Sequence, residues 1–169
     1  MREGFDLDAW LRAALGRVEP VLRGRFAGGW PPAFAGALEY PLFTGGKRVR
    51  PALVLAACEA VGGALDAAVP VAVAFELVHT YSLVHDDLPC MDDDDFRRGM
   101  PTVHKRFDEA TAVLVGDGLL TEAFAVLAEA PLPVEVRVAV IARLAVASGP
   151  SGMVGGQAAD VAGGVSTLA

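Results

Sequence analysis

The sequence predicts an all-α protein, an antiparallel helical bundle, on three observations. Hydrophobic residues make up 53% of the 169 residues, and the helix-forming residues Ala and Leu are prominent among them. Apolar residues recur at helical spacing over long stretches. Short breaks containing Gly or Pro separate these stretches, and helices joined by short loops pack antiparallel. We expect residues 1–169 to form a single helical domain.

The breaks and the apolar spacing locate the predicted helices along the chain. Pro51 sits in the first turn of one helix, where proline is tolerated, and this helix ends near residue 61. Asp66 is expected to cap the next helix, which runs to about residue 87, before a polar loop over residues 91–102. The other predicted helical segments cover residues 6–26, 108–129, 134–147 and 150–162, and a short segment spans residues 34–43.

The charge balance argues against a nucleic-acid partner. The chain has 21 acidic and 14 basic residues and a formal net charge of -7, whereas nucleic-acid binders carry a basic patch. The acids are concentrated between Asp86 and Asp95. A dense carboxylate cluster suits a cation site, so we expect an anionic substrate to arrive with metal ions.

The sequence also predicts a cytoplasmic protein with no membrane span. Cys58 and Cys90 are too few and too far apart for a disulfide framework. The charged N-terminus, MREGFDLDAWLRAALGRVEP, does not have the pattern of a secretory signal. No apolar run approaches the roughly 18 residues of a spanning helix, since Asp66 and Pro70 interrupt the longest one.

The aspartate cluster carries the clearest chemistry. Asp86, Asp87 and Asp92 offer the hard oxygen ligands that Mg²⁺ prefers, at the end of an apolar helix. Arg97 and Arg98 follow, and arginine suits bidentate contacts with phosphate. Acidic loops at helix ends are commonly only solvated. The combination with paired arginines is what favours a site for a metal-bound diphosphate.

A second cluster of cations lies in the sequence GGKRVRP, residues 45–51. Lys47 and Arg50 are three residues apart and share a face once a helix begins. A glycine turn that leads into a helix N-terminus can hold an anion. His79 lies seven residues before Asp86, two turns away on the same helix face. Taken alone, the basic cluster could equally be soluble surface.

These motifs resemble those of the trans-prenyl diphosphate synthases, and most closely the bacterial farnesyl diphosphate synthases (geranyltranstransferases). The resemblance rests on GGKRVRP and YSLVHDDLPCMDDDDFRRGMPT and extends over residues 40–160, through GDGLLTEAF and SGMVGGQAAD. It implies a helical bundle of the isoprenoid synthase type around a deep cavity. It also implies a Mg²⁺-dependent prenyltransferase that condenses isopentenyl diphosphate with dimethylallyl or geranyl diphosphate to give farnesyl diphosphate.

The implied reaction proceeds by ionisation, condensation and proton loss. Cleavage of the allylic carbon–oxygen bond leaves a carbocation and a diphosphate, whose charge is stabilised by Mg²⁺ and Arg. No side-chain nucleophile is required, and apolar walls keep water away from the cation.

The resemblance implies a role for each matching residue. Asp86 and Asp92, with Asp87 beside them, would hold the Mg²⁺ ions on the allylic diphosphate. Arg97 would contact that diphosphate and completes the expected catalytic set with Asp86 and Asp92. Isopentenyl diphosphate would be bound by Lys47, Arg50, His79 and Arg98.

Four residues separate the Asp pair from Asp92, a spacing that resembles the bacterial farnesyl type. In a regular helix Asp86 and Asp92 would point about 240° apart. Pro89 removes that regularity, so the chain can return Asp92 to the metal. Further along, Gln157 and Asp160 match a polar pair that faces the cavity in the family.

Tyr81 and Ser82 bear on product length. Ser82 lies one helical turn before Asp86, and Tyr81 lies about 7 Å from Asp86 along the helix axis. Bulky residues at such positions close the floor of the cavity in the family, so Tyr81 suggests a product of farnesyl length. The alternative is that Tyr81 is an ordinary core aromatic residue.

The sequence departs from the family in one respect. A second Asp-rich motif, which binds a further Mg²⁺ in the family, has no equivalent in the 169 residues. We therefore expect the 169 residues to form only the N-terminal part of the fold and to be nearly inactive in isolation. The alternative is a non-catalytic diphosphate-binding fragment or a regulatory subunit. The intact cations and aspartates favour descent from an active enzyme, for which the family implies a homodimer.

Overall fold

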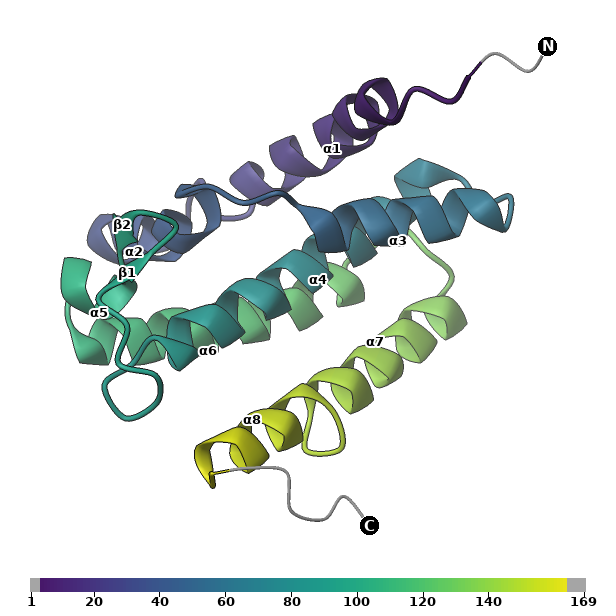
Figure 1. Cartoon of the computed structure of the whole chain (residues 1–169). Coiled ribbons are helices and arrows are strands. Elements are labelled where there is room, and N and C mark those ends of the chain that lie inside the picture. The colour runs from purple at the N-terminus through teal and green to yellow at the C-terminus, as the bar shows by residue number, and fades with distance from the viewer. Residues whose placement is uncertain (1–3, 164–169) are drawn as a thin grey trace.

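Helices make up nearly all of the regular structure, which confirms the predicted all-α bundle (Figure 1). The computed structural model describes residues 4–163. In chain order its elements are α1 (Leu7–Gly24), α2 (Pro32–Phe43), α3 (Val49–Ala60), α4 (Leu65–Asp86), β1 (Phe96–Arg97), β2 (Met100–Pro101), α5 (Val103–Arg106), α6 (Glu109–Ala128), α7 (Val134–Ser148) and α8 (Met153–Val161). The two strands form a short antiparallel hairpin in the loop after α4, which the sequence did not predict.

Helix α4 is the central element of the bundle. It buries residues along its whole length and on almost every side, and α6, α3 and α1 pack around it (Figure 1). A helix that is apolar all round is stable only when other elements cover it. The surrounding helices bury a single face; in α1 the buried residues Ala14, Val18 and Leu22 recur every four positions.

Aspartates begin two of the helices, although not the one expected. Asp6 and Asp108 cap α1 and α6, and each accepts a hydrogen bond from the backbone amide three residues on, at 2.9 and 2.7 Å. The predicted cap at Asp66 is wrong, because α4 begins one residue earlier. Asp66 instead lies in the first turn, where its charge favours the helix dipole, and pairs with Arg17 of α1 at 2.5 Å.

The expectation that no stretch could span a membrane is not confirmed. Among residues 4–163, three helical stretches are long and apolar enough by length and composition: Leu65–Asp86, Glu109–Ala128 and Val134–Val161. Helix α4 runs through Asp66 and Pro70 without a break. The fold buries 67% and 44% of the first two apolar windows, but only 11% of the third. The apolar composition of α4 therefore matches its central position, whereas α7 and α8 leave apolar side chains exposed.

Candidate functional site

The basic cluster forms the turn between α2 and α3 and lines a cavity of about 440 Å³. Lys47 and Arg50 are both exposed there. Gly45 and Gly46 have φ values of +100° and +154°, which residues with a side chain rarely adopt. The lining residues are Thr44, Gly45, Gly46, Lys47, Arg48, Val49, Arg50, Glu76, His79 and Arg98. The cavity thus collects cationic side chains from the turn, from α3 and from the hairpin.

His79 of α4 is half-buried in this cavity. Burial, followed by the charges of Arg50, Arg98 and Arg97, lowers the pKa of His79 from 6.5 to about 4. The imidazole is therefore neutral at pH 7. A bound anion would offset the three positive charges, so it would raise the pKa of His79 again.

The four-residue spacing in the aspartate motif closes into a turn. The amide of Asp92 donates to the carbonyl of Asp86 at 2.8 Å, which brings the two residues together after α4 ends. Burial raises the pKa of the Asp86 carboxyl, and the charge of Asp92 raises it further, while Arg97 acts in the opposite direction. Burial and repulsion between neighbouring carboxylates thus outweigh the opposing charge of Arg97 at Asp86.

Asp87 faces Arg97 of the hairpin. Its side chain is buried and accepts a hydrogen bond from Arg97 Nε at 2.7 Å. Burial raises the pKa of Asp87, and the bond to Arg97 limits that rise. Arg97 also lies 3.6 Å from the carboxylate of Asp94. The sequence grouped Asp87 with Asp86 and Asp92 as a carboxylate that could hold Mg²⁺, and the structure pairs this carboxylate with Arg97.

Arg98 connects the two motifs. It has a left-handed backbone, with φ of +55°, and its guanidinium donates to the carbonyl of Gly45, 53 residues earlier in the chain. A Cβ added at Gly46 would lie 2.7 Å from Arg98 Nη1. The glycine turn therefore leaves room for the arginine of the hairpin.

Helix α8 reaches the carboxylate end of α4. The side-chain amide of Gln157 donates to the carboxylate of Asp86. The charge of Asp160 contributes to the raised pKa of Asp86. The polar pair identified from the sequence thus lies close to the aspartate motif.

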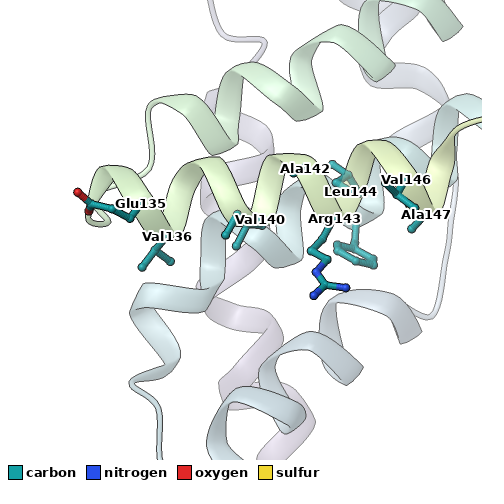
Figure 2. A pocket seen from close by; sticks show the side chains of 10 residues that line it. Glu135, Val136, Val140, Ala142, Arg143, Leu144, Val146 and Ala147 are labelled. Atoms are coloured by element: carbon teal, nitrogen blue, oxygen red, sulfur yellow. The ribbon is translucent and has the colours of Figure 1, made fainter.

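Apolar space adjoins the basic cavity. A smaller cavity of about 150 Å³ shares Arg50 and His79 with it and also contacts Phe75 and Leu144. Those last two residues also line a groove of about 870 Å³ along α7, and Figure 2 shows that the side chains around this groove are mostly aliphatic. A cationic cavity that leads into apolar space suits a ligand with an anionic head and a hydrocarbon tail.

Tyr81 and Ser82, the residues expected to limit product length, are both buried. The ring of Tyr81 packs edge-on against that of His85, with centroids 5.8 Å apart. Ser82 Oγ donates to the carbonyl of His79 at 2.9 Å. Neither residue lines the three cavities described here, and Tyr81 belongs to the hydrophobic core.

Asp93, Asp95 and His104 form a separate group with ligand atoms within 4.8 Å of one another. His104 is buried; its Nδ1 lies 3.1 Å from the hydroxyl of Thr102, and its Nε2 has no hydrogen-bond partner among the described residues. Lys105 already pairs with Asp95 at 2.8 Å. The lysine therefore competes for the position that a metal ion would occupy on that carboxylate.

The fold and the site together define a helical protein with adjoining anion-binding and cation-binding groups beside an apolar groove. Residues 31–167 match the polyprenyl synthetase family. The chain belongs to this family, as its motifs indicated, and its fold is that of the isoprenoid synthase prenyltransferases.

The individual relatives differ in the product for which they are named. The chain is 53% identical over 141 residues to the farnesyl diphosphate synthase of Geobacillus stearothermophilus, covering 82% of this chain and 48% of the relative. It is 45% identical over 161 residues to geranylgeranyl pyrophosphate synthase 7 of Arabidopsis thaliana, covering 95% and 46%. The crystal structure of an FPP/GFPP synthase from Zymomonas mobilis has a TM-score of 0.87 at 43% identity, covering 96% of this chain and 60% of that chain. The chain thus spans about half the length of the curated relatives it matches.

Proposed function

We propose that these residues form the part of a farnesyl diphosphate synthase that binds both diphosphate substrates. One observation carries the proposal: the basic turn and the arginine pair, far apart in sequence, surround a single histidine. Arg98 donates to Gly45, and the charges of Arg50, Arg98 and Arg97 all act on the pKa of His79. Cations and carboxylates in adjoining spaces suit two diphosphates, one bound directly and one through metal.

The carboxylate end of α4 fits magnesium. Asp86 and Asp92 are hard oxygen donors. Burial and the charge of Asp92 raise the pKa of Asp86, and a bound cation would lower it. We assign the Mg²⁺ ions on the allylic diphosphate to these two residues, with Asp87 beside them orienting Arg97 toward the same diphosphate. Bound Mg²⁺ would supply charge neutralisation of the leaving diphosphate.

The basic cavity is assigned to isopentenyl diphosphate, bound by Lys47, Arg50, His79 and Arg98. Lys47 and Arg50 provide permanent charge, and neutral His79 can donate one hydrogen bond. The hydrocarbon parts of the substrates would lie in the adjoining apolar space. Such walls exclude water from a developing carbocation.

Farnesyl diphosphate is the proposed product. Tyr81 is bulky and buried, five residues before Asp86 at the carboxylate end of α4, and Ser82 lies next to it in the sequence. We propose that their bulk limits the depth available to a growing chain, although neither residue lines the three cavities described above. Longer products from a Tyr81→Ala variant of a complete enzyme would support this assignment, and an unchanged product length would contradict it.

The second candidate is a non-catalytic, diphosphate-binding fragment or regulatory subunit. It is favoured by the exposed apolar residues of α7 and α8. We propose that the 169 residues form one incomplete helical domain that binds diphosphates and is nearly inactive alone. The active protein is proposed to be a cytoplasmic homodimer.

Calorimetric titration of the 169-residue chain tests the proposed sites. Geranyl diphosphate should bind in the presence of Mg²⁺ and at least about tenfold more weakly in EDTA or with Asp86→Asn or Asp92→Asn. Asp95→Asn is the matched control, because Asp95 is exposed and already pairs with Lys105, and it should bind normally. A chain that binds neither geranyl nor isopentenyl diphosphate would contradict the proposed sites.

A turnover assay with isopentenyl and geranyl diphosphates separates the enzyme from the binding fragment. We expect very little product from the 169 residues alone. Robust Mg²⁺-dependent product formation would show that the predicted near-inactivity is wrong, but it would not contradict the assigned binding sites.

A further inference from the structure

We propose that Arg48 is a positioning residue, which holds the basic turn so that Lys47 and Arg50 face the cavity. The inference rests on the proposed function of that cavity. Arg48 lies between the two cations that are assigned to isopentenyl diphosphate, yet only 8% of it is exposed. Its neighbours Lys47 and Arg50 are both exposed. The turn therefore directs one cation inward and two outward.

Three hydrogen bonds connect the Arg48 guanidinium to three helices. Nε donates to Glu19 of α1 at 2.7 Å, Nη1 to Glu76 of α4 at 2.8 Å, and Nη2 to the carbonyl of Leu42, near the end of α2, at 2.7 Å. Each of its three nitrogens thus already has an acceptor. Three of its five N–H groups are engaged in this way, and the side chain is buried. It is well suited to fix the turn relative to the bundle.

The backbone of the turn shows why it needs such an anchor. Arg48 has φ of +48° and ψ of +38°, a left-handed conformation that persists in residues other than glycine only when the surrounding structure maintains it. The preceding residues, Gly45 and Gly46, have the least restricted backbone dihedral angles of any residue type. Local propensity therefore does not determine this turn. Instead, the three hydrogen bonds of the Arg48 side chain determine the conformation of the turn. They thereby also determine the directions in which Lys47 and Arg50 point.

A test must distinguish the effect of the positive charge of Arg48 on anion binding from its effect on the position of the turn. Glu76 is 2% exposed and lines the same cavity. Removing only Arg48 would leave that carboxylate buried and unpaired, which would both destabilise the fold and repel an anion. The double variant Arg48→Met/Glu76→Met removes one charge of each sign. Apolar replacement of a buried ion pair generally retains the fold, so this variant removes the anchor without changing the net charge.

The experiment is calorimetric titration of the 169-residue chain with inorganic diphosphate in EDTA, where only the basic cavity should bind. We expect Arg48→Met/Glu76→Met to bind at least about tenfold more weakly than the unmodified chain. Its thermal midpoint and its Mg²⁺-dependent affinity for geranyl diphosphate should be unchanged. The matched control is Arg25→Met/Glu122→Met, which removes a partly buried pair between the end of α1 and α6 and should leave diphosphate affinity unchanged.

A conservative variant provides an independent readout. Arg48→Lys keeps the charge but cannot reach three acceptors in the same geometry, so it should also bind diphosphate more weakly. Full affinity in Arg48→Lys, or in a normally melting Arg48→Met/Glu76→Met, would overturn the inference. If the double variant melts early, Arg48→Lys decides the question. If the unmodified chain does not bind diphosphate in EDTA, the proposed function of the cavity fails first.

Discussion

His79 illustrates how the neighbours of a residue change its chemistry. The sequence grouped it with Lys47 and Arg50 as a ligand for a diphosphate. In the fold, burial and the charges of Arg50, Arg98 and Arg97 lower its pKa to about 4. Before an anion binds, His79 is therefore a neutral donor and not a third permanent cation.

Replacing His79 by Gln should make the fold less sensitive to acid. Unfolded histidine titrates near 6.5 and folded His79 near 4. Between these values the unfolded state binds more protons, so the free energy of unfolding falls as pH decreases. Because the side chain is only half-buried, solvent screening reduces this loss to about 1 kcal/mol.

Urea unfolding at about pH 7 and about pH 5 measures this difference. The unmodified chain should lose more stability on acidification than His79→Gln. Equal losses in the two proteins would mean that His79 does not titrate in this range.

Asp87 provides the second prediction for a single residue. Asp87→Asn should lower the free energy of unfolding by about 1–3 kcal/mol, because it weakens a buried, charge-assisted bond to Arg97. It should also weaken the binding of Mg²⁺ and geranyl diphosphate, since Arg97 would lose its fixed orientation. Denaturant unfolding and calorimetric titration measure the two effects.

Asp94→Asn is the control for this variant. Asp94 is exposed and lies 3.6 Å from the same arginine, so its removal should change stability by less than about 0.5 kcal/mol. If the two substitutions lowered stability equally, the burial of Asp87 would not be the reason for its contribution to stability.

At the level of elements, the contact between α4 and α6 depends on a missing side chain. His85 of α4 packs onto Gly116 of α6 and bonds with the carbonyl of Val113 at 3.1 Å. A Cβ at Gly116 would lie 2.0 Å from His85 Nε2. The two helices can approach this closely only because residue 116 is glycine.

Gly116→Ala should therefore destabilise the fold by about 1–2 kcal/mol, since displacement of the His85 ring outweighs the gain in helix propensity. Adding His85→Ala should recover part of this loss, as a thermal double-mutant cycle would show. In contrast, Gly16→Ala in α1, where a Cβ meets nothing within 4 Å, should be neutral or stabilising. Additive effects at Gly116 and His85 would contradict the contact.

Elements were the level at which the sequence was most informative. Long apolar periods and Gly or Pro breaks predicted each main helix to within a few residues, because those signals are local. The hairpin at Phe96–Pro101 is too short to produce a period. The cap at Asp66 was misassigned because α4 begins at Leu65, one residue earlier, and local signals place helix ends only to within one or two residues.

On the scale of the whole molecule, the site depends on contacts between distant segments. The sequence identified the residue types of the site, but not that Arg48 turns inward to Glu19 and Glu76 or that Asp87 holds Arg97. Motif spacing specifies which side chains are available. Their partners follow only once α1, α2 and α4 are packed, because each is separated from its partner by many residues.

The same packing leaves one face of the molecule apolar and exposed. Helices α7 and α8 bury few residues, and side chains such as Val136 and Val146 line the wide groove along α7 (Figure 2). Contiguous apolar surface of this kind promotes dye binding and self-association. It is also the surface on which charge can be introduced with least effect on the core.

Val136→Glu/Val146→Glu should therefore reduce binding of an apolar fluorescent dye severalfold and should lessen self-association in sedimentation experiments, while helicity by circular dichroism stays unchanged. Both side chains are exposed, at 42% and 64%, so the new carboxylates remain in water. Val61→Glu is the matched control, since Val61 is 85% exposed at the end of α3 and away from the groove; it should not change dye binding. If the double variant and the control bind dye equally, the exposed apolar surface that matters lies elsewhere than along α7.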